Sequence, residues 1–385
     1  MKDVVKLMPV IEIYKLSLAT KRSKAIVKSM KLKTDGFAVS LCQRLTHINI
    51  ISIEMNNKST TQAFYDRTDE DILRSQAKVK ETKHIVSDPI NKCLEMAKGL
   101  ITLFESKSCK FLLHINYKEP EELKQILSKI LTQPYTEIFF SGDYMGRYGG
   151  YNADSVIDGG VLEYLMNNVK LDSSLSIQAR FPEGFNHGNA FKFRKICYWN
   201  CSWVKLETLK SFRNAGSISL FDTNLDSKTI NELLTYWVNS DEDMMEDIGL
   251  RIIPGNRFIK DEVLNNLITT VVVEDQPTYF LKARNTENRK RILGKLTIWE
   301  NTSSVGIDLE TVGAKEEYKV QLEILELKEE EKDLENKLKE LEDSKKEVQS
   351  ESSNKEEALK QLVDRKDAVQ LELGEVRKKL LALKA

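Results

Sequence analysis

Two cysteines close together in the sequence are the first residues here whose type and spacing suggest chemistry. Cys197 and Cys201 could ligate one metal ion together, and Zn²⁺ is the ion that paired thiolates usually hold. A zinc site needs a second pair of cysteines or histidines at ligand spacing, and the sequence contains no such pair. We therefore interpret both residues as buried thiols, and we expect no bound metal and no cofactor.

A glycine-rich segment, 141–150, is the second candidate because it follows a predicted strand. It matches neither nucleotide-binding fingerprint, since it lacks Gly-Lys-Ser/Thr and has no glycine triplet at the required spacing. A surface loop is the better interpretation. Aromatic and arginine side chains are the commonest anchors of protein interfaces, so the loop could contact a partner. The residues that would do so are Tyr144, Arg147, Tyr148 and Tyr151.

The histidines give no support for hydrolase or protease chemistry. They lie far apart in the sequence, with no serine or cysteine nucleophile elbow beside them. An enzyme would also need a buried pocket in which titratable groups converge, and the sequence points to none. We therefore expect a protein that is not an enzyme. The histidines are His47, His84, His114 and His187.

Charge and composition exclude further classes. Lysine plus arginine (58) nearly equal aspartate plus glutamate (59), so the basic bias of a nucleic-acid-binding surface is missing. No window approaches the roughly 18 apolar residues of a membrane-spanning helix. The five cysteines are scattered, and the first residues do not resemble a signal sequence. We expect no nucleic-acid or membrane partner, and a cytoplasmic or nuclear location.

The clearest element that the sequence predicts is a coiled-coil helix over 313–385. Steps of three and four residues keep one unbroken register there, and such a heptad stripe needs a partner helix to cover it. The polar interruptions are Glu331, Lys345, Ser352, Lys355 and Lys366. The apolar seam consists of Ile324, Leu327, Leu334, Leu338, Leu341, Val348, Leu359, Leu362, Val369, Leu373, Val376, Leu380 and Leu383.

Two geometries fit this heptad pattern. One straight helix of about 100 Å, at 1.5 Å per residue, could pair with a second copy as a homodimer. Alternatively, the polar centre at 343–357 could turn back, so that two shorter helices pack antiparallel within the chain. The unbroken register slightly favours the straight form and therefore self-association.

The N-terminal segment, 1–40, is predicted to form two or three short helices. Pro9 ends the first of them, because proline cannot continue a helix as an interior residue. Helices this small cannot bury their own apolar face, so that face must dock elsewhere. The segment therefore has the character of an interaction module.

The middle of the chain is predicted to be an α/β body. The segment 41–100 is predicted to be a linker or weakly structured, because 57–92 is polar and charged without clear periodicity and can be assigned only as weak helix or linker. From 101 to 312, short β-rich runs alternate with helical ones. The spacing of a leucine-rich-repeat strand and its turn occurs at Ile196, Tyr198, Cys201 and Trp203. Because similar runs recur at unequal intervals, we predict an irregular leucine-rich-repeat-like β/α body.

Two stretches carry a family resemblance. The run 5–28, VKLMPVIEIYKLSLATKRSKAIVK, resembles the F-box of the large nematode F-box families, which have an apolar helix, a short break, Leu-Ser-Leu, a Ser or Thr, and Lys-Arg. The stretch 195–252 contains YWNCSW at 198–203 and LLTYWV at 233–238. It is similar to the type 2 F-box-associated domain of the same proteins, which would span about 190–260.

This resemblance implies the substrate-recognition adaptor of an SCF-type E3 ubiquitin ligase. The F-box would bind a Skp1-like adaptor and, through it, a cullin, while the C-terminal domain would hold an unknown target protein. Burial of apolar side chains at about 25 cal/mol per Å² could drive the adaptor contact. The residues implied for that contact are Val5, Leu7, Met8, Ile11, Ile13, Leu16 and Leu18.

The sequence departs from the family pattern at both ends. The Leu-Pro element that usually precedes the first helix is missing, so the F-box is expected to be truncated at its N-terminus. The coiled coil is also not a usual part of the family. These departures leave an alternative, a coiled-coil scaffold or structural protein with a vestigial F-box.

Overall fold

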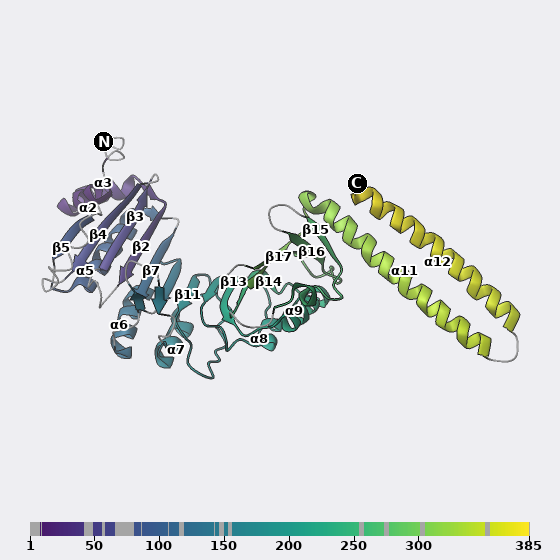
Figure 1. Cartoon of the computed structure of the whole chain (residues 1–385). Coiled ribbons are helices and arrows are strands. Elements are labelled where there is room, and N and C mark those ends of the chain that lie inside the picture. Colours follow the sequence, from purple (N-terminus) through teal and green to yellow (C-terminus); the bar gives the residue numbers. More distant parts are fainter. Residues whose placement is uncertain are drawn as a thin grey trace. The chain divides into compact units, whose positions relative to one another are not determined.

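The computed structural model describes most of the chain, and Figure 1 shows its elements. The described residues are 8, 10–41, 49–55, 58–65, 81–85, 87–106, 108–114, 119–141, 143–145, 150–152, 156–253, 258–272, 277–300, 305–350 and 355–384. Within 49–65, 81–85 and 143–152 only the backbone is described. The chain forms two units, Met1–Val204 with Ala215–Asn224, and Lys205–Asn214 with Leu225–Ala385.

A mixed sheet runs through the first unit, in the order β13-β12-β11-β8-β7-β2-β3-β4-β5 (Figure 1). Strand β3 pairs antiparallel with both of its neighbours, and all the other pairs are parallel. The strands are β2 (Gly36–Leu41), β3 (Asn49–Met55), β4 (Lys58–Tyr65), β5 (Glu81–Ile85), β7 (Cys109–His114), β8 (Glu137–Ser141), β11 (Ser174–Gln178), β12 (Lys195–Tyr198) and β13 (Ala215–Thr223). Two short strands, β1 (Lys33–Thr34) and β6 (Glu105–Ser106), pair with each other in parallel.

Two rows of buried apolar side chains cross the parallel part of this sheet. Residues in register on neighbouring strands point to the same face, and the register aligns apolar residues from six strands in each row. None of them is more than 5% exposed. One row is Val39, Phe111, Ile138, Leu175, Ile196 and Ile218, and the other is Leu41, Leu113, Phe140, Ile177, Tyr198 and Leu220.

Helices connect the parallel strands and supply the apolar side chains that complete this core. They are α5 (Pro89–Leu103), α6 (Pro120–Leu131) and α7 (Gly159–Asn168). Proline opens the first two, where its missing N–H costs no hydrogen bond. Asp158 caps α7, because its side chain accepts a hydrogen bond from the Val161 amide at 2.9 Å. Helices α6 and α7 lie side by side along the strands (Figure 1).

The N-terminal helices α2 (Val10–Ala19) and α3 (Lys21–Ser29) pack on each other and on α5. A reciprocal capping box separates them, with the Ser23 amide donating to Thr20 Oγ1 and the Thr20 amide donating to Ser23 Oγ, both at 2.9 Å. Tyr14 of α2 lies against Gly99 of α5, where an added Cβ would be 2.8 Å from the tyrosine ring. Glycine at this position therefore lets the two helices approach each other.

The second unit contains an antiparallel sheet and the C-terminal helices. Its strands, in sheet order, are β15 (Thr269–Val272), β16 (Thr278–Lys282), β17 (Leu293–Glu300), β18 (Val305–Val312) and β14 (Met245–Ile252). Helix α9 (Ser227–Asn239) is capped by Asp226, whose carboxylate accepts from the Thr229 amide at 2.8 Å. Helices α8 (Leu206–Lys210) and α10 (Lys260–Val263) both contact α9. None of the helices in the described ranges combines the length and apolar character needed to cross a bilayer.

The C-terminal segment forms a hairpin of two long helices, α11 (Lys319–Ser350) and α12 (Lys355–Lys384). A 3₁₀ turn, Glu316–Tyr318, leads into α11. Near the start of α11, Nζ of Lys282 on β16 lies 2.6 Å from Oε2 of Glu329. Leu325 of α11 is buried beside Phe280 and Leu293 of the sheet. The first turns of α11 are thus part of the core of the second unit.

The structure confirms the mixed α/β class and the long C-terminal helical segment, and it differs from expectation in two places. Of the two geometries that fit the heptads, the slightly favoured straight helix is wrong and the hairpin is found, because α11 and α12 pack against each other within one chain. The segment 41–100, expected as a weakly structured linker, contains β3, β4, β5 and most of α5. Polar strands such as β4 (Lys58–Tyr65) gain their stability from paired neighbours, which composition does not reveal.

Candidate functional site

The second face of the parallel sheet carries both polar and apolar groups. Side chains alternate between faces along a strand, so the residues between the two buried rows form a row of their own. All of them except buried Ser176 are half-buried. This middle row consists of Ser40, Leu112, Phe139, Ser176, Cys197 and Ser219.

An aromatic stack continues this face just past the end of β12. The rings of Trp199 and Phe221 lie parallel, with centroids 4.6 Å apart and an interplanar angle of 13°. The Trp199 amide donates to the carbonyl of Ile177 at 2.9 Å, which extends the parallel pairing by one residue. Both rings are half-buried. The face therefore carries partly exposed aliphatic and aromatic side chains, which are the groups that protein partners contact.

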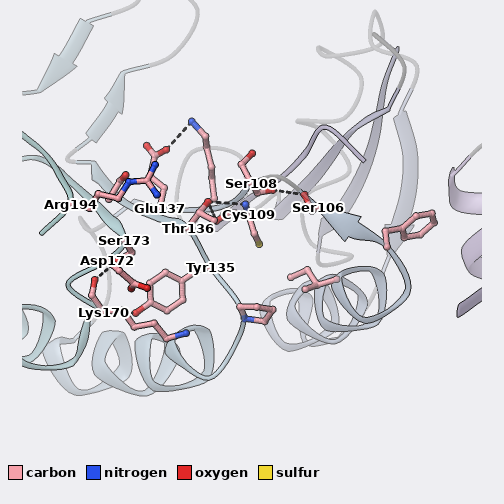
Figure 2. A pocket seen from close by; sticks show the side chains of 15 residues that line it. Ser106, Ser108, Cys109, Tyr135, Thr136, Glu137, Lys170, Asp172, Ser173 and Arg194 are labelled. Carbon is pink, nitrogen blue, oxygen red and sulfur yellow. Dashed lines mark hydrogen bonds and ion pairs between the residues drawn. The ribbon is translucent and has the colours of Figure 1, made fainter. Parts of the chain in front are cut away.

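A hollow of about 610 Å³ opens at the other end of the same strands, where β7, β8, β11 and β12 begin (Figure 2). Three of its residues, Lys110, Glu137 and Ser174, are in register with one another on the second face of the sheet. The hollow is therefore continuous with that face. Its lining also includes Ser106, Ser108, Cys109, Tyr135, Thr136, Lys170, Asp172, Ser173 and Arg194.

The charges around the hollow are unequal. Lys110 pairs with Glu137 at 2.8 Å. Lys170 lies over the ring of Tyr135, 5.1 Å from its centroid, and among the described residues neither Lys170 nor Arg194 makes an ion pair. Asp172 is the remaining acidic residue of the lining. The hollow therefore keeps an excess of positive charge.

The segments that carry Lys170 and Arg194 are held by hydrogen bonds from the backbone amides of these two residues. The Lys170 amide donates to the Tyr135 hydroxyl at 2.8 Å, and the Arg194 amide donates to the carbonyl of Leu171 at 2.7 Å. Burial raises the pKa of Tyr135, which keeps its hydroxyl protonated. An added Cβ at Gly216 would lie 1.9 Å from the Arg194 carbonyl oxygen. Only glycine permits this close approach of β13, which holds Arg194 in place.

The two cysteines singled out by spacing lie in different environments. Cys201 is fully buried and donates to the Tyr198 carbonyl at 3.2 Å, while Cys197 is half-buried in the middle row. Burial raises the pKa of both thiols. Cys109 at the hollow is similarly desolvated, which raises its pKa to about 12. No group of three or more metal-binding side chains occurs among the residues that the structure describes.

The expected partner loop contains a small β-hairpin. Strands β9 (Asp143–Met145) and β10 (Gly150–Asn152) pair antiparallel, and Tyr144 lies directly opposite Tyr151. Arg147 and Tyr148 are outside the described residues. The hairpin thus brings together the two tyrosines at either end of the predicted set.

The expected adaptor-binding residues divide into two groups. Ile11 (8% exposed) and Ile13 (0%) are buried, so they are core residues of this chain and not free anchors. Leu16 (37%) and Leu18 (63%) are exposed on the same helix, and Met8 is half-buried. Val5 and Leu7 lie outside the described residues. The apolar face of α2 is thus partly covered by the chain itself and partly open.

The coiled-coil seam is covered within the chain. All of the seam residues expected from the heptads are buried or half-buried, and those in the half of the hairpin away from its turn form one buried cluster. Arg377 pairs with Glu331 at 2.8 Å and Glu335 at 2.6 Å, and Lys366 pairs with Glu342 at 2.9 Å. The polar seam positions Glu331 and Lys366 therefore have partners across the hairpin. A second copy is not needed to cover this stripe.

Comparisons with known proteins add no relatives to this description. The chain matches no protein-family model, and neither the curated proteins nor the solved structures contain a match. The argument for function therefore depends on the residues and their geometry.

Reasoning from sequence did not find the hollow. Its lining comes from α5, β6, β7, β8, β11 and the segments that precede them, and no local motif joins these segments. The one available signal was the basic run Lys192 to Lys195, where Lys192, Arg194 and Lys195 stand together in a chain of net charge −1.

Proposed function

We propose that this protein is a non-catalytic substrate-recognition adaptor of an SCF-type E3 ubiquitin ligase, acting in the cytoplasm or nucleus. In this proposal α2 and α3 are the F-box helices that bind a Skp1-like adaptor and, through it, a cullin. The irregular leucine-rich-repeat-like body predicted over 101–312, which includes the F-box-associated domain, holds the target. The F-box-like run at 5–28 and the similarity of 190–260 to the F-box-associated domain support this assignment.

One observation carries the proposal, namely that α2 keeps exposed leucines although the rest of its apolar face is buried. Leu18 is 63% exposed and Leu16 37%, and they belong to the Leu-Ser-Leu element of the F-box-like run. Covering one leucine side chain is worth about 1.5–3 kcal/mol. A partner that covers both would therefore gain a substantial part of its binding free energy there.

The sequential order of the parallel strands supports a recognition role for the body. Strands β7, β8, β11, β12 and β13 are neighbours in the sheet in the same order as in the chain, as in repeat proteins, which use one extended face for binding. The aromatic stack and the middle row lie on such a face. The alternative of a self-associating scaffold has less support, because α11 and α12 cover their own seam.

The test is a pulldown with a purified Skp1-type adaptor. We expect the intact protein to bind and Leu16→Asp plus Leu18→Asp to lose binding. The matched control is Leu371→Asp plus Leu381→Asp, since both of these leucines are 70% exposed on α12, and it should bind as the intact protein does. Absence of binding by the intact protein, or equal binding by both double variants, would refute the proposal.

A further inference from the structure

The hollow at the start of the parallel strands and the middle row beside it form one composite surface. Lys110 and Leu112 are two residues apart on β7, and Glu137 and Phe139 are two residues apart on β8. Alternate residues of a strand point to the same face and lie about 7 Å apart. The charged groups of Lys110 and Glu137 are therefore two residues of extended chain away from the half-buried side chains of Leu112 and Phe139.

The positive charge at this surface lacks compensation. Lys195 of β12 is in register with Ser174, which lines the hollow together with Lys170 and Arg194. Lys170, Arg194 and Lys195 are exposed and make no ion pair with any described residue. In a chain whose net charge is −1, this local excess favours an anionic group in the hollow.

We propose that this surface binds an extended acidic segment of a protein partner, with a Glu or Asp carboxylate held at the hollow by the positive charge of Lys170, Arg194 and Lys195. An apolar side chain two residues away in the same segment packs on Leu112 and Phe139. The inference rests on the proposed function, because it gives the chemical character of the target that the body would hold.

The acidic residues of the surface explain why the partner is a peptide and not a nucleic acid. Asp172 and Glu137 belong to the same lining as Lys170 and Arg194. A nucleic acid carries a phosphate at every nucleotide, and these carboxylates would repel a continuous row of phosphates. An isolated carboxylate can instead be held by the excess positive charge, and its apolar neighbour can use the half-buried side chains.

The first experiment selects binders from a random nine-residue peptide library displayed on phage, using the full-length protein. We expect enrichment of peptides with Glu or Asp two positions from Leu, Ile or Phe. The same selection on Lys170→Glu plus Arg194→Glu should lose this enrichment. The matched control, Lys98→Glu plus Lys228→Glu, makes the same charge change at two exposed lysines outside the hollow and should retain it.

The second experiment titrates the best peptide by fluorescence anisotropy. Replacing its acidic residue by Lys should weaken binding at least tenfold, and so should the Lys170→Glu plus Arg194→Glu variant. Raising the salt from about 50 to about 300 mM should also weaken it. Enrichment without acidic residues, unchanged binding by the variant, or tighter binding of a ten-nucleotide oligothymidine than of the peptide would overturn the inference.

The adaptor pulldown, made with the same variants, separates this inference from the proposed function. Lys170→Glu plus Arg194→Glu should keep the adaptor and lose the peptide, while Leu16→Asp plus Leu18→Asp should do the reverse. Melting temperatures within about 2 °C of the intact protein show that each variant is folded. Loss of both ligands by either folded variant would refute the assignment of two separate surfaces.

Discussion

The helix pairs at the two ends of the chain cover their apolar stripes in different ways. Helices α11 and α12 cover each other, with Leu334, Leu373 and Val376 all buried in one cluster. Helices α2 and α3 instead pack on α5, where Tyr14 of α2 lies against Gly99, while Leu18 of α2 remains 63% exposed. A complete seam leaves little for a partner to cover, so the adaptor binding that we propose would use the incomplete one.

The largest expected effect tests whether α2 is part of the core. Ile13→Ala removes a side chain that is 0% exposed, and such truncations cost about 2–5 kcal/mol. Denaturant unfolding followed by circular dichroism measures the loss. Leu18→Ala on the same helix is the control and should change the free energy of unfolding by about 0.5 kcal/mol or less. Similar losses for both would mean that α2 is not packed on the body.

The second prediction concerns the seam of the hairpin. Leu373→Ala should destabilise the α11–α12 contact by about 2 kcal/mol, because Leu373 is 6% exposed in the cluster. We expect the amides of α11 and α12 to lose protection from hydrogen exchange while those of the first unit keep theirs. Leu371→Ala, at a position that is 70% exposed, is the control. If Leu373→Ala instead changed the oligomeric state measured by ultracentrifugation, the seam would bind a second copy.

A smaller effect is expected where α2 meets α5. The Cβ of Gly99→Ala would lie 2.8 Å from the ring of Tyr14, and overpacking of this kind costs about 1–3 kcal/mol. The gain in helix propensity, about 1 kcal/mol, offsets part of it. Combining Gly99→Ala with Tyr14→Ala should remove the clash, so the double-mutant cycle should show coupling. Strictly additive effects would contradict the contact.

The smallest expected effect distinguishes the two helix pairs by pH. Burial raises the pKa of Tyr14 above its usual 10.0. The contribution of the neutral tyrosine to the free energy of unfolding is therefore complete below pH 10 and is lost as the pH rises through the raised pKa. The hydrogen bond from Lys366 lowers the pKa of Glu342 below its usual 4.5. That contribution is present above pH 4.5 and is lost as the pH falls through the lowered value. Helicity measured against pH should therefore fall at both the alkaline and the acid end, and we call these two losses the alkaline limb and the acid limb.

Single substitutions assign these limbs. Tyr14→Phe should reduce the alkaline loss and leave the acid limb unchanged, and Lys366→Met should do the opposite. A Tyr14→Phe variant with the same alkaline midpoint as the intact protein would show that another group controls docking of α2.

The parts of the structure that could be predicted from sequence are those with local patterns. The heptads of 313–385 define the seam residue by residue, because each contact repeats along a single helix axis. The pattern does not define the direction of the chain in the middle, so the choice between dimer and hairpin had to come from the structure. Asp226 as the cap of α9 is similarly local.

The parts that could not be predicted depend on register between distant segments. Phe111, Ile138 and Ile218 belong to one buried row although they are far apart in the chain. Their strands are short, and a shift of one residue would exchange the two faces. The hollow depends on the same register, since Lys110, Glu137 and Ser174 line it from three paired strands. The covered part of α2 was missed because its neighbour α5 lay in the presumed linker.

The sequential strand order also bears on how the chain is made. Strands β7, β8, β11, β12 and β13 pair in the order in which they occur in the chain, with the β9–β10 hairpin between β8 and β11. Each new strand thus pairs with one made before it, although every parallel pair must first close a crossover. The sheet can therefore grow one strand at a time as the chain leaves the ribosome. Each finished strand becomes the template for the next, so nascent edges are exposed only for the time it takes to synthesise one more β/α step.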